Sequence, residues 1–338
     1  MNEHSTFCFK PMSSENPKKN NLLTEMRNLM RRLHYSIHTE NAYCDWVAKY
    51  IHFHKMQVRE ALFIEPKKKV EDYLTYLAVQ ANVAASTQNQ AFNALIFLYK
   101  RVLAHPLENI QATRTQKKPH IPVVLTREEV KQILSLLENT PELLVKLIYG
   151  CGLRITEAVR LRVKDIDYGY KQVTVRNGKG MQDRVTPFPA SIEPLLCNYL
   201  DRVKTIHTQD LAAGYGTVYL PYALARKYPN AEKEWNWQYV FPSSKLSTDP
   251  RSGRIQRHHI DQSVINKAIK QAVQTLGITK KVSAHTFRHS FATHLLQRGT
   301  DIRTIQSLLG HKDLETTMIY THVLKQGGEG VMSPLDDL

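Results

Sequence analysis

The sequence predicts a mostly helical α+β protein, with an N-terminal helical bundle followed by a larger domain that contains a small β-hairpin or sheet. The chain of 338 residues has room for about two domains. Apolar residues recur at helical spacing through most of it. Residues 171–189 differ, because valines there alternate with polar residues around Asn177-Gly178, a sequence typical of a tight hairpin turn.

The N-terminal third is expected to be a bundle of four helices. Residues 1–20 are polar and contain lysines, and we expect a disordered tail. Residues 21–105 carry helical patterns over about 22–36, 38–54, 70–79 and 84–103, joined by short connections. The first pattern places Leu23, Met26, Met30 and Leu33 on one face, and the second buries Ala42, Trp46, Val47 and Tyr50. The polar faces of these helices have the composition that a DNA-binding module needs. They could equally be the solvent-exposed faces of an ordinary helical bundle.

Residues 106–120 interrupt the helical periodicity. They are polar, basic and bounded by prolines, which predicts an extended linker. A basic linker between two basic domains would suit a clamp around a DNA duplex.

The second domain is expected over residues 121–325. Thr126 and Glu129 form a capping-box pattern, and another helix follows Pro141. A glycine-flanked turn then leads into an amphipathic helix, with Arg154 at the junction. This turn could suggest a dinucleotide-binding loop, but it lacks the third glycine and the preceding strand. The hairpin projects Lys179, a position where a lysine is usually a solubilising charge.

Residues 285–320 predict three short helices that carry chemically active side chains. Ser283 or Thr286 can open the first helix, and Gly299 can close it. The second runs from about Asp301 to Leu309 and ends at Gly310. The third starts near residue 313 and has Tyr320 near its end. The side chains that these helices bring together can form a phosphate-handling site: His285, Arg288, His311 and Tyr320.

The net charge indicates the class of partner, and the cysteine content indicates the cellular compartment. Lys and Arg number 46 against 31 acidic residues, a formal net charge of +15, which favours a polyanion such as nucleic acid. A basic protein without a special ligand remains open, whereas no lipidation signal supports a membrane surface. The cysteines form no CxxC pair: Cys8, Cys44, Cys151 and Cys197. With no long apolar run and no apolar signal core, we expect a cytoplasmic protein.

Six residues in order resemble the active-site set of the tyrosine recombinase (phage integrase) family. They are Arg154 in GLRITE, Lys179 in the hairpin, His285 and Arg288 in HTFR, His311 after Gly310, and Tyr320 in TTMIYTH. The resemblance covers about residues 22–325 and implies a helical core-binding domain followed by the family's catalytic domain.

The resemblance also implies a role for each residue. Tyr320 is the nucleophile, which forms a phosphotyrosyl link to the 3′ side of the cut strand. Arg154 and Arg288 clamp the phosphate. Lys179 protonates the departing 5′ oxygen, His285 acts in proton transfer at the tyrosine, and His311 hydrogen-bonds the phosphate. No metal or other cofactor is expected.

The histidines of this region could also suggest a metal site, since His285, His289 and His294 have ligand-like spacing. The sequence HTFRH, however, lacks the glutamate of a zinc-hydrolase helix, and His294 lies well around the helix from the other two. His289 is expected to be a structural neighbour of the site.

An added segment over about residues 205–238, with a helix over Tyr222 to Tyr228, precedes a strand expected at YVFPS. Together with STDPRSGRIQRHHI and the chain's last residues it resembles the bacterial integron integrases. That resemblance implies contacts to bases flipped out of a folded single-stranded site, from Trp237, His258 and His259. Trp235 is a further candidate, and both tryptophans could instead pack the added helix onto the domain. The tail, 326–338, could dock on a neighbouring subunit or simply fray.

The function expected from these resemblances is that of an integron integrase. It would insert and excise gene cassettes through a Holliday junction, at duplex attachment sites and folded single-stranded cassette sites. Its partners would be DNA and three further copies of itself, in a homo-tetramer, with no membrane and no small-molecule substrate. The alternatives are a chromosome-dimer-resolving or phage-type recombinase, and a DNA-binding regulator without catalysis. The regulator is disfavoured because binding alone does not need Tyr320.

Overall fold

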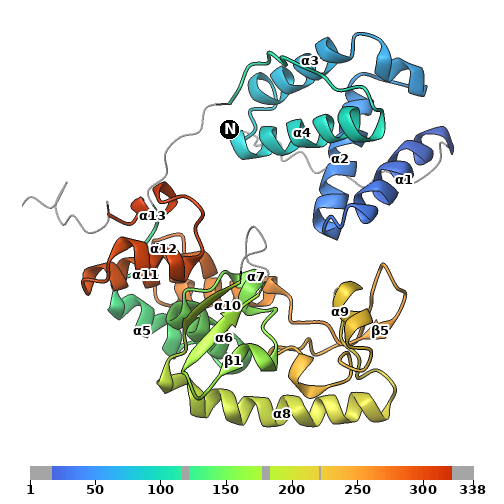
Figure 1. Cartoon of the computed structure of the whole chain (residues 1–338). Coiled ribbons are helices and arrows are strands. Elements are labelled where there is room, and N and C mark those ends of the chain that lie inside the picture. Colours follow the sequence, from blue (N-terminus) through green and yellow to red (C-terminus); the bar gives the residue numbers. More distant parts are fainter. Residues whose placement is uncertain (1–16, 116–121, 177–182, 221, 322–338) are drawn as a thin grey trace, which may run out of the picture. The chain divides into compact units, whose positions relative to one another are not determined.

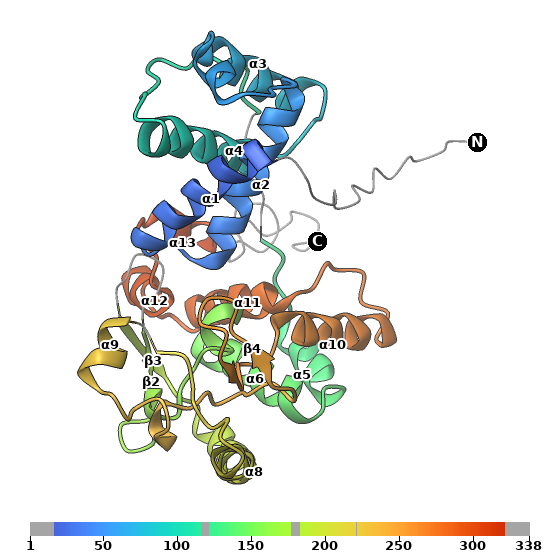
Figure 2. The same ribbon diagram turned by 90° about the vertical axis from the view of Figure 1, so that its right-hand side faces the viewer.

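The computed structural model describes residues 17–115, 122–176, 183–220 and 222–321. The chain divides into two compact units, residues 1–119 and 120–338, and each is described by itself. Figures 1 and 2 show that the first unit is entirely helical, and that the second combines helices with two small sheets. The mostly helical α+β class that the sequence predicted is confirmed.

The first unit is a helical bundle. Its elements are α1 (Pro17–Arg32), α2 (Ile37–Phe53), the 3₁₀ turn η1 (Arg59–Phe63), α3 (Pro66–Val79), α4 (Ala85–Phe97) and the π-helical turn η2 (Leu98–Val102). Helix α2 packs against α1 and α4, and α4 also packs against α3. Met26, Val47, Leu74 and Leu95 are fully buried between these helices. Ser36 caps α2, because its side chain accepts a hydrogen bond from the Thr39 N–H.

Helix α1 differs from its prediction at both ends. It begins at Pro17, inside the stretch expected to be a disordered tail. Its buried side is formed by Leu22, Met26 and Met30, which follow one another at four-residue spacing, whereas Leu33 is 45% exposed. Leu33 lies beyond the last helical residue, so it no longer follows the buried face.

Residues 110–115, from the predicted linker, form an extended strap on the first unit. The Gln111 N–H donates to the Glu71 carboxylate at 2.6 Å. The Gln88 amide donates to the Thr113 carbonyl at 2.7 Å and accepts from the Thr115 N–H at 3.0 Å. Gln88 is 1% exposed. These bonds attach the chain to α3 and α4 as far as Thr115, and residues 116–121 lie outside the described part.

The second unit holds most of the helices. They are α5 (Arg127–Ser135), α6 (Asn139–Cys151), α7 (Ile155–Ala158), α8 (Glu193–Ala212), α9 (Tyr222–Lys227), α10 (Gln262–Thr275), α11 (Ala284–Gln297), α12 (Ile302–Leu309) and α13 (Glu315–Met318), with 3₁₀ turns η3 (Val163–Asp165), η4 (Ala190–Ile192) and η5 (Trp235–Trp237). Helix α6 packs against α10 and α11. Leu144, Ile148, Ile269 and Phe287 are fully buried in this core.

Two small antiparallel sheets complete the second unit. The first has the order β1 (Ile166–Asp167), β2 (Gln172–Val175), β3 (Arg184–Pro187), and the second pairs β4 (Ser247–Thr248) with β5 (Ile255–Gln256). The predicted pairing of the hairpin strands is confirmed. Val175 pairs with Arg184, however, whereas a two-residue turn at Asn177-Gly178 would pair it with Gly180. The turn itself, with Lys179, lies outside the described residues.

Local capping signals were predicted well in this unit. The Thr126–Glu129 capping box is present, with its two bonds at 2.7 and 3.1 Å. Asp301 caps α12 by accepting from the Thr304 N–H, and Gly310 ends this helix at a φ of 62°. The helix expected after Arg154 is a single turn, and Tyr320 lies just past α13 rather than inside a longer helix.

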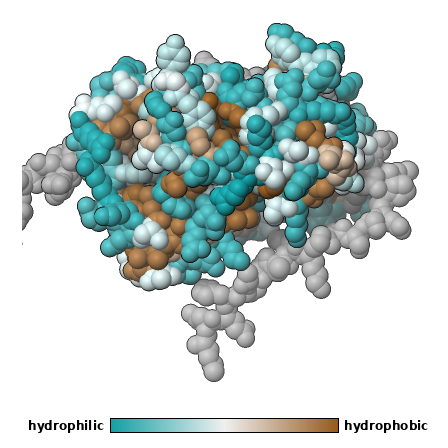
Figure 3. All heavy atoms as spheres, turned by 90° about the horizontal axis from the view of Figure 1, so that it is seen from below, coloured by the Kyte–Doolittle hydropathy of each residue, from teal (hydrophilic) through white to brown (hydrophobic). Residues whose placement is uncertain are grey.

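The added segment is folded as part of the second unit. Val218, Leu220, Ala231 and Tyr239 form a small apolar cluster, against which Trp237 packs. Residues 239–243 form isolated bridges to Arg162 and His259 instead of the expected strand. On the face in Figure 3, apolar side chains are interspersed with polar ones. None of the helices in the described part of the chain is both long and apolar enough to cross a membrane.

Candidate active site

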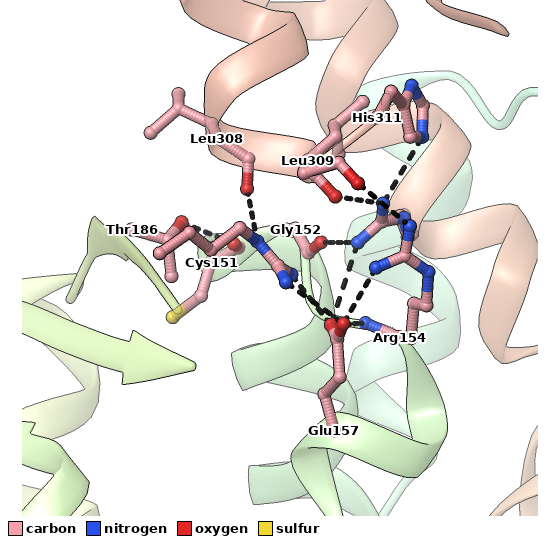
Figure 4. Close-up of polar contacts among 11 residues, drawn as sticks. Cys151, Gly152, Arg154, Glu157, Thr186, Leu308, Leu309 and His311 are labelled. Carbon is pink, nitrogen blue, oxygen red and sulfur yellow. Dashed lines mark hydrogen bonds and ion pairs between the residues drawn. The ribbon is translucent and has the colours of Figure 1, made fainter. Parts of the chain in front are cut away.

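A buried carboxylate surrounded by three arginines lies where α6, α7, α12 and β3 meet (Figure 4). Glu157 accepts from Arg154 at 2.7 Å and from both terminal nitrogens of Arg184 at 2.9 and 2.6 Å. Arg288 lies 3.8 Å from the same carboxylate. We call Glu157 and these three arginines the arginine cluster. Their side chains are 9% (Glu157), 20% (Arg154), 8% (Arg184) and 4% (Arg288) exposed, so Arg154 is the most open to solvent.

Backbone carbonyls at two helix ends hold the arginines in place. Arg288 donates to the Gly152 carbonyl at 2.5 Å and to the Leu309 carbonyl at 2.6 Å. Arg184 donates to the Leu308 carbonyl at 2.8 Å. These carbonyls lie at the C-terminal ends of α6 and α12, where the last carbonyls lack helical partners and the helix dipole is negative. The two helix ends therefore help to stabilise cations at this position.

Gly152 fits this arrangement for two reasons. Its φ of +64° lies in the left-handed region, and a Cβ there would come within 2.4 Å of the Phe291 ring. The chain can thus turn sharply after α6, which brings the Gly152 carbonyl to Arg288 and places Arg154 at the start of α7.

The electrostatics of the cluster leave a net positive site. Burial would raise the pKa of Glu157, but hydrogen bonds from Arg184 and Arg154 hold it at about 2. Burial and the charge of Arg154 lower the pKa of Arg288 to about 9, so Arg288 stays charged at neutral pH. One carboxylate thus neutralises only part of the charge of three guanidiniums, and the remainder favours an anion such as phosphate.

His311 adjoins the cluster. Its Nε2 lies 3.3 Å from an Arg288 nitrogen, which can only donate, and its Nδ1 lies 2.9 Å from the Thr317 hydroxyl. This pattern assigns the proton of the neutral ring to Nδ1. Burial and the charge of Arg288 lower the pKa of His311 to about 4.

Tyr320 is 1% exposed and lies beside the same histidine, with the two rings stacked at 6.4 Å between centroids. Burial raises the pKa of its phenol, while Arg288 and Arg154 act in the opposite direction. The resting side chain is therefore the neutral phenol. Its hydroxyl forms a hydrogen bond of 2.9 Å with Nδ1 of His289.

His285 lies in the first turn of α11 and is exposed. Although the side chain reaches solvent, partial desolvation of its ring and the charges of Arg288 and Arg154 lower its pKa. The structure thus brings together Arg154, Arg288, His311 and Tyr320, with His285 beside them. Lys179 lies outside the described residues, but β3, which follows it, is bound to the cluster through Arg184.

Two residues of the site, Glu157 and Arg184, were not singled out in the sequence, and a third, His289, has a closer contact than was expected. Glu157 follows Arg154 by three positions at a helix start, a spacing that could have indicated the pair. Arg184 and His289 make their contacts with distant parts of the chain, and no local pattern marks them. His289 was expected to be only a neighbour, but it contacts the Tyr320 hydroxyl directly.

Three of the four candidate base-contacting residues, Trp237, His258 and His259, lie together with Tyr239 and Arg162, and we call these five residues the aromatic cluster. Tyr239 lies 5.5 and 5.3 Å from the two imidazole rings, which are 4.0 Å apart. Arg162 lies over the Tyr239 ring at 4.9 Å and donates to the Trp237 carbonyl at 2.5 Å. In Figure 1, α9 and β5, which flank this cluster in sequence, lie at the other end of the unit from α11–α13.

The two tryptophans have different surroundings. Trp237 is half-buried, with the Lys164 ammonium 2.7 Å from its ring centre. Burial and the charge of Arg176 lower the pKa of that ammonium to about 8. Trp235 packs against the main core of the unit and lies 6.0 Å from the His207 ring. Trp235 therefore does not share the aromatic cluster.

The histidines of α11 have separate partners. His294 Nδ1 is hydrogen-bonded to the Tyr149 hydroxyl at 2.8 Å, while His289 contacts Tyr320. Within the described residues, no three His, Cys, Asp or Glu side chains are placed to hold a metal ion. A neutral phenol beside fixed guanidiniums is instead suited to attack on a phosphodiester.

Family models match both units of the chain. Residues 123–327 match the phage integrase family, and residues 22–109 match the phage integrase N-terminal SAM-like domain.

Curated relatives cover nearly the whole chain. Proteins named "Integrase/recombinase" from Escherichia coli and Pseudomonas aeruginosa are each 47% identical over 318 residues, which is 94% of this chain and 94% of theirs. A "Tyrosine recombinase" from Thermosipho africanus is 30% identical over 311 residues, 87% of this chain and 92% of its own.

Solved structures share the fold. A XerH site-specific recombinase bound to its difH substrate, in a pre-cleavage complex, has a TM-score of 0.57 at 19% identity, covering 92% of this chain and 96% of that one. The Tn1549 transposon integrase in complex with transposon right end DNA has a TM-score of 0.54 at 13% identity, covering 88% and 94%.

Proposed function

This chain belongs to the phage integrase family of tyrosine recombinases, enzymes that cleave and rejoin DNA, and we propose that it is an integron-type member that inserts and excises gene cassettes. The observation that carries the catalytic part is that hydrogen bonds and ion pairs join Arg154, Arg288 and His311, and that the Tyr320 ring stacks on His311. The integron part rests on the folded segment 205–238 and on the aromatic cluster.

In the proposed reaction, Arg154 and Arg288 bind the non-bridging oxygens of the scissile phosphate. Both arginines stay charged, and Arg154 is the more exposed, so it is the one that an incoming phosphate reaches first. Negative charge grows on these oxygens in the transition state, where fixed cations contribute most. Because carbonyls and Glu157 already hold the guanidiniums in place, little reorganisation is needed when DNA binds.

Tyr320 attacks the phosphorus and displaces the 5′ oxygen, which takes a proton from Lys179. The product is a 3′-phosphotyrosyl bond that conserves the phosphodiester energy, so rejoining to another 5′-hydroxyl needs no ATP. His311 would donate a hydrogen bond to the phosphate through Nε2. This requires its proton to leave Nδ1, and Thr317 can accommodate the change because its hydroxyl both donates and accepts. His285 stands as a proton-transfer group at the rim.

The aromatic cluster supports recognition of unpaired bases. Trp237 is half-buried among cationic side chains, and aromatic rings beside cations stack unpaired bases without needing a duplex. His258 and His259 both contact the Tyr239 ring of this cluster, and they would contact a neighbouring extruded base. Trp235 is the weaker choice, because it packs against the core.

The proposed partners are duplex attachment sites, folded single-stranded cassette sites and further copies of this chain in a tetramer on DNA, acting in the cytoplasm. The structural neighbours described as bound to DNA substrates support the DNA part. The alternative within the family is a chromosome-dimer-resolving or phage-type recombinase, and the relatives named tyrosine recombinase are compatible with it. A DNA-binding regulator without catalysis is disfavoured, because DNA binding alone does not require the arginine cluster to lie near the buried Tyr320.

The test is the formation of a covalent protein–DNA complex. The full-length protein is incubated with a labelled folded bottom-strand cassette site and, separately, with the duplex form of the same site. We expect a denaturant-resistant, protease-sensitive adduct that Tyr320→Phe abolishes without weakening DNA binding. An adduct on the folded strand supports the integron type, and one on duplex alone supports the alternative. Tight binding without an adduct on either form would contradict catalysis.

A further inference from the structure

The Tyr320 hydroxyl has a direct hydrogen-bond partner outside the set that the family resemblance named. Nδ1 of His289 lies 2.9 Å from it, and the ring centroids are 5.6 Å apart. His289 follows Arg288 on α11, so the same helical turn carries a phosphate-binding guanidinium and the contact to the tyrosine. A nucleophile and a base at 2.6–3.2 Å have the separation expected for proton transfer.

We propose that His289 is a catalytic residue, which accepts the phenolic proton as Tyr320 attacks the phosphate. The inference rests on the proposed function, because it takes Tyr320 as the nucleophile. It reassigns the proton acceptor at the tyrosine from His285 to His289.

The surroundings of His289 keep its imidazole neutral in the free protein. His285 and Arg288 act on it from α11, and His311, beyond the end of α12, stacks on the Tyr320 ring. Burial, the neighbouring His285 and the charge of Arg288 lower the pKa of His289 to about 4. A neutral imidazole with its proton on Nε2 presents a lone pair at Nδ1, which can accept from the phenol. The raised pKa of Tyr320 means that its proton needs such an acceptor.

The proton transfer balances within the site. The Tyr320 oxygen forms a bond to phosphorus while its proton moves to Nδ1 of His289, which becomes an imidazolium. The bond from phosphorus to the 5′ oxygen breaks, and that oxygen takes a proton from Lys179. On rejoining, an incoming 5′-hydroxyl gives its proton to Lys179, and His289 returns its own to the departing phenolate.

DNA binding itself would strengthen the base. The charge of Arg288, which helps to hold the His289 pKa down, is offset when a phosphate anion binds between Arg154 and Arg288. The imidazolium becomes easier to form only when the substrate is in place. The free enzyme would thus hold its nucleophile protonated until DNA arrives.

The test uses single-turnover cleavage by the full-length protein, on whichever DNA site gives an adduct with the wild type. His289→Ala should slow cleavage by about 10²–10⁴-fold with unchanged DNA affinity. Replacing Tyr320 by a fluorinated tyrosine with a more acidic phenol should recover most of that loss, because the proton then leaves without a base. A bridging 5′ sulfur in the DNA should not recover it, since sulfur relieves only the need to protonate the leaving group.

Two matched variants make the result specific. Lys179→Ala should show the opposite pattern, recovered by the bridging sulfur and not by the acidic phenol. His289→Asn can keep the hydrogen bond but cannot take up a proton, so it should keep its melting temperature near that of the wild type and still be slow. Cleavage by His289→Asn at the wild-type rate, or a loss that the acidic phenol does not recover, would overturn the inference. An adduct that persists in Tyr320→Phe would instead overturn the proposed function.

Discussion

The arginine cluster and the aromatic cluster both place cations against other side chains, but they hold those cations differently. In the arginine cluster the guanidiniums are fixed by a carboxylate and by backbone carbonyls at two helix ends. In the aromatic cluster, Arg162 is also held by the Trp237 carbonyl and lies over the buried Tyr239 ring, whereas the neighbouring Lys164 lies against the half-buried Trp237 ring. The first arrangement is fixed by hydrogen bonds at each guanidinium, whereas in the second Lys164, which lies against a ring face, can adapt to what the cluster binds. We infer that the first supports the chemistry and the second the choice of DNA.

The largest effect should come from Arg288, whose two carbonyl partners require a planar guanidinium. Arg288→Lys keeps the positive charge but cannot donate in the same two directions. We expect single-turnover cleavage to fall on the order of 10²–10³-fold, with DNA affinity little changed. Arg303→Lys on α12 is the control, because Arg303 is exposed and pairs only with Gln306 among the contacts described. Equal cleavage rates for Arg288→Lys and Arg303→Lys would show that the fixed guanidinium of Arg288 is not needed for the chemistry.

The second effect concerns stability and is centred on Glu157. Glu157→Gln preserves the shape but leaves buried guanidiniums without their anion, which typically costs about 3–5 kcal/mol of unfolding free energy. Glu129→Gln is the matched control, because Glu129 pairs with a partly exposed lysine and should cost far less. Chemical denaturation of both variants measures the difference. A loss below that of the control would show that the arginines do not depend on this carboxylate.

The same carboxylate predicts a pH dependence. Its pKa is about 2 in the folded protein, below its value in the unfolded chain. Its contribution to stability is therefore fully present above the unfolded pKa of about 4.3, and it is lost as the pH falls from there toward 2. The unfolding free energy of the wild type should decline more steeply over this window than that of Glu157→Gln.

The smallest effect should appear in the aromatic cluster as a change in selectivity. Trp237→Ala should weaken binding to folded single-stranded sites by about 1–3 kcal/mol and leave duplex binding unchanged. Trp235→Ala provides the contrast, because Trp235 packs against the core and its loss should lower the melting temperature instead. Competition binding with folded and duplex forms of one site measures the selectivity of both variants, and thermal denaturation measures their melting temperatures. Equal losses on the two forms for Trp237→Ala would count against base stacking.

Those elements that depend on local chemistry could be predicted from the sequence. The capping box at Thr126 and the closing Gly310 act within a few residues, so their patterns were sufficient. Helix α9 of the added segment was also predicted within a residue or two of its ends. The predicted burial of Leu33 was wrong, because α1 ends at Arg32 and Leu33 therefore does not lie on its buried face.

The polar contacts between distant segments could not be predicted in this way. Arg184 reaches Glu157 and the end of α12 only because β3 pairs with β2 in the observed register. Gln88 holds residues 113–115 through hydrogen bonds that a polar linker composition does not reveal. His289 looks like any neighbour of Arg288 until α13 brings Tyr320 beside it. In each case the signal lies in the tertiary arrangement and not in the local sequence.

The most direct measurement is to identify the residue that carries the DNA. The covalent complex is formed on a folded cassette site, digested with nuclease and protease, and sequenced by mass spectrometry. We expect a single phosphorylated tyrosine, Tyr320, in the peptide that follows α12. Phosphate on another of the 16 tyrosines, or on a serine, would contradict the assignment of the arginine cluster as the site of cleavage.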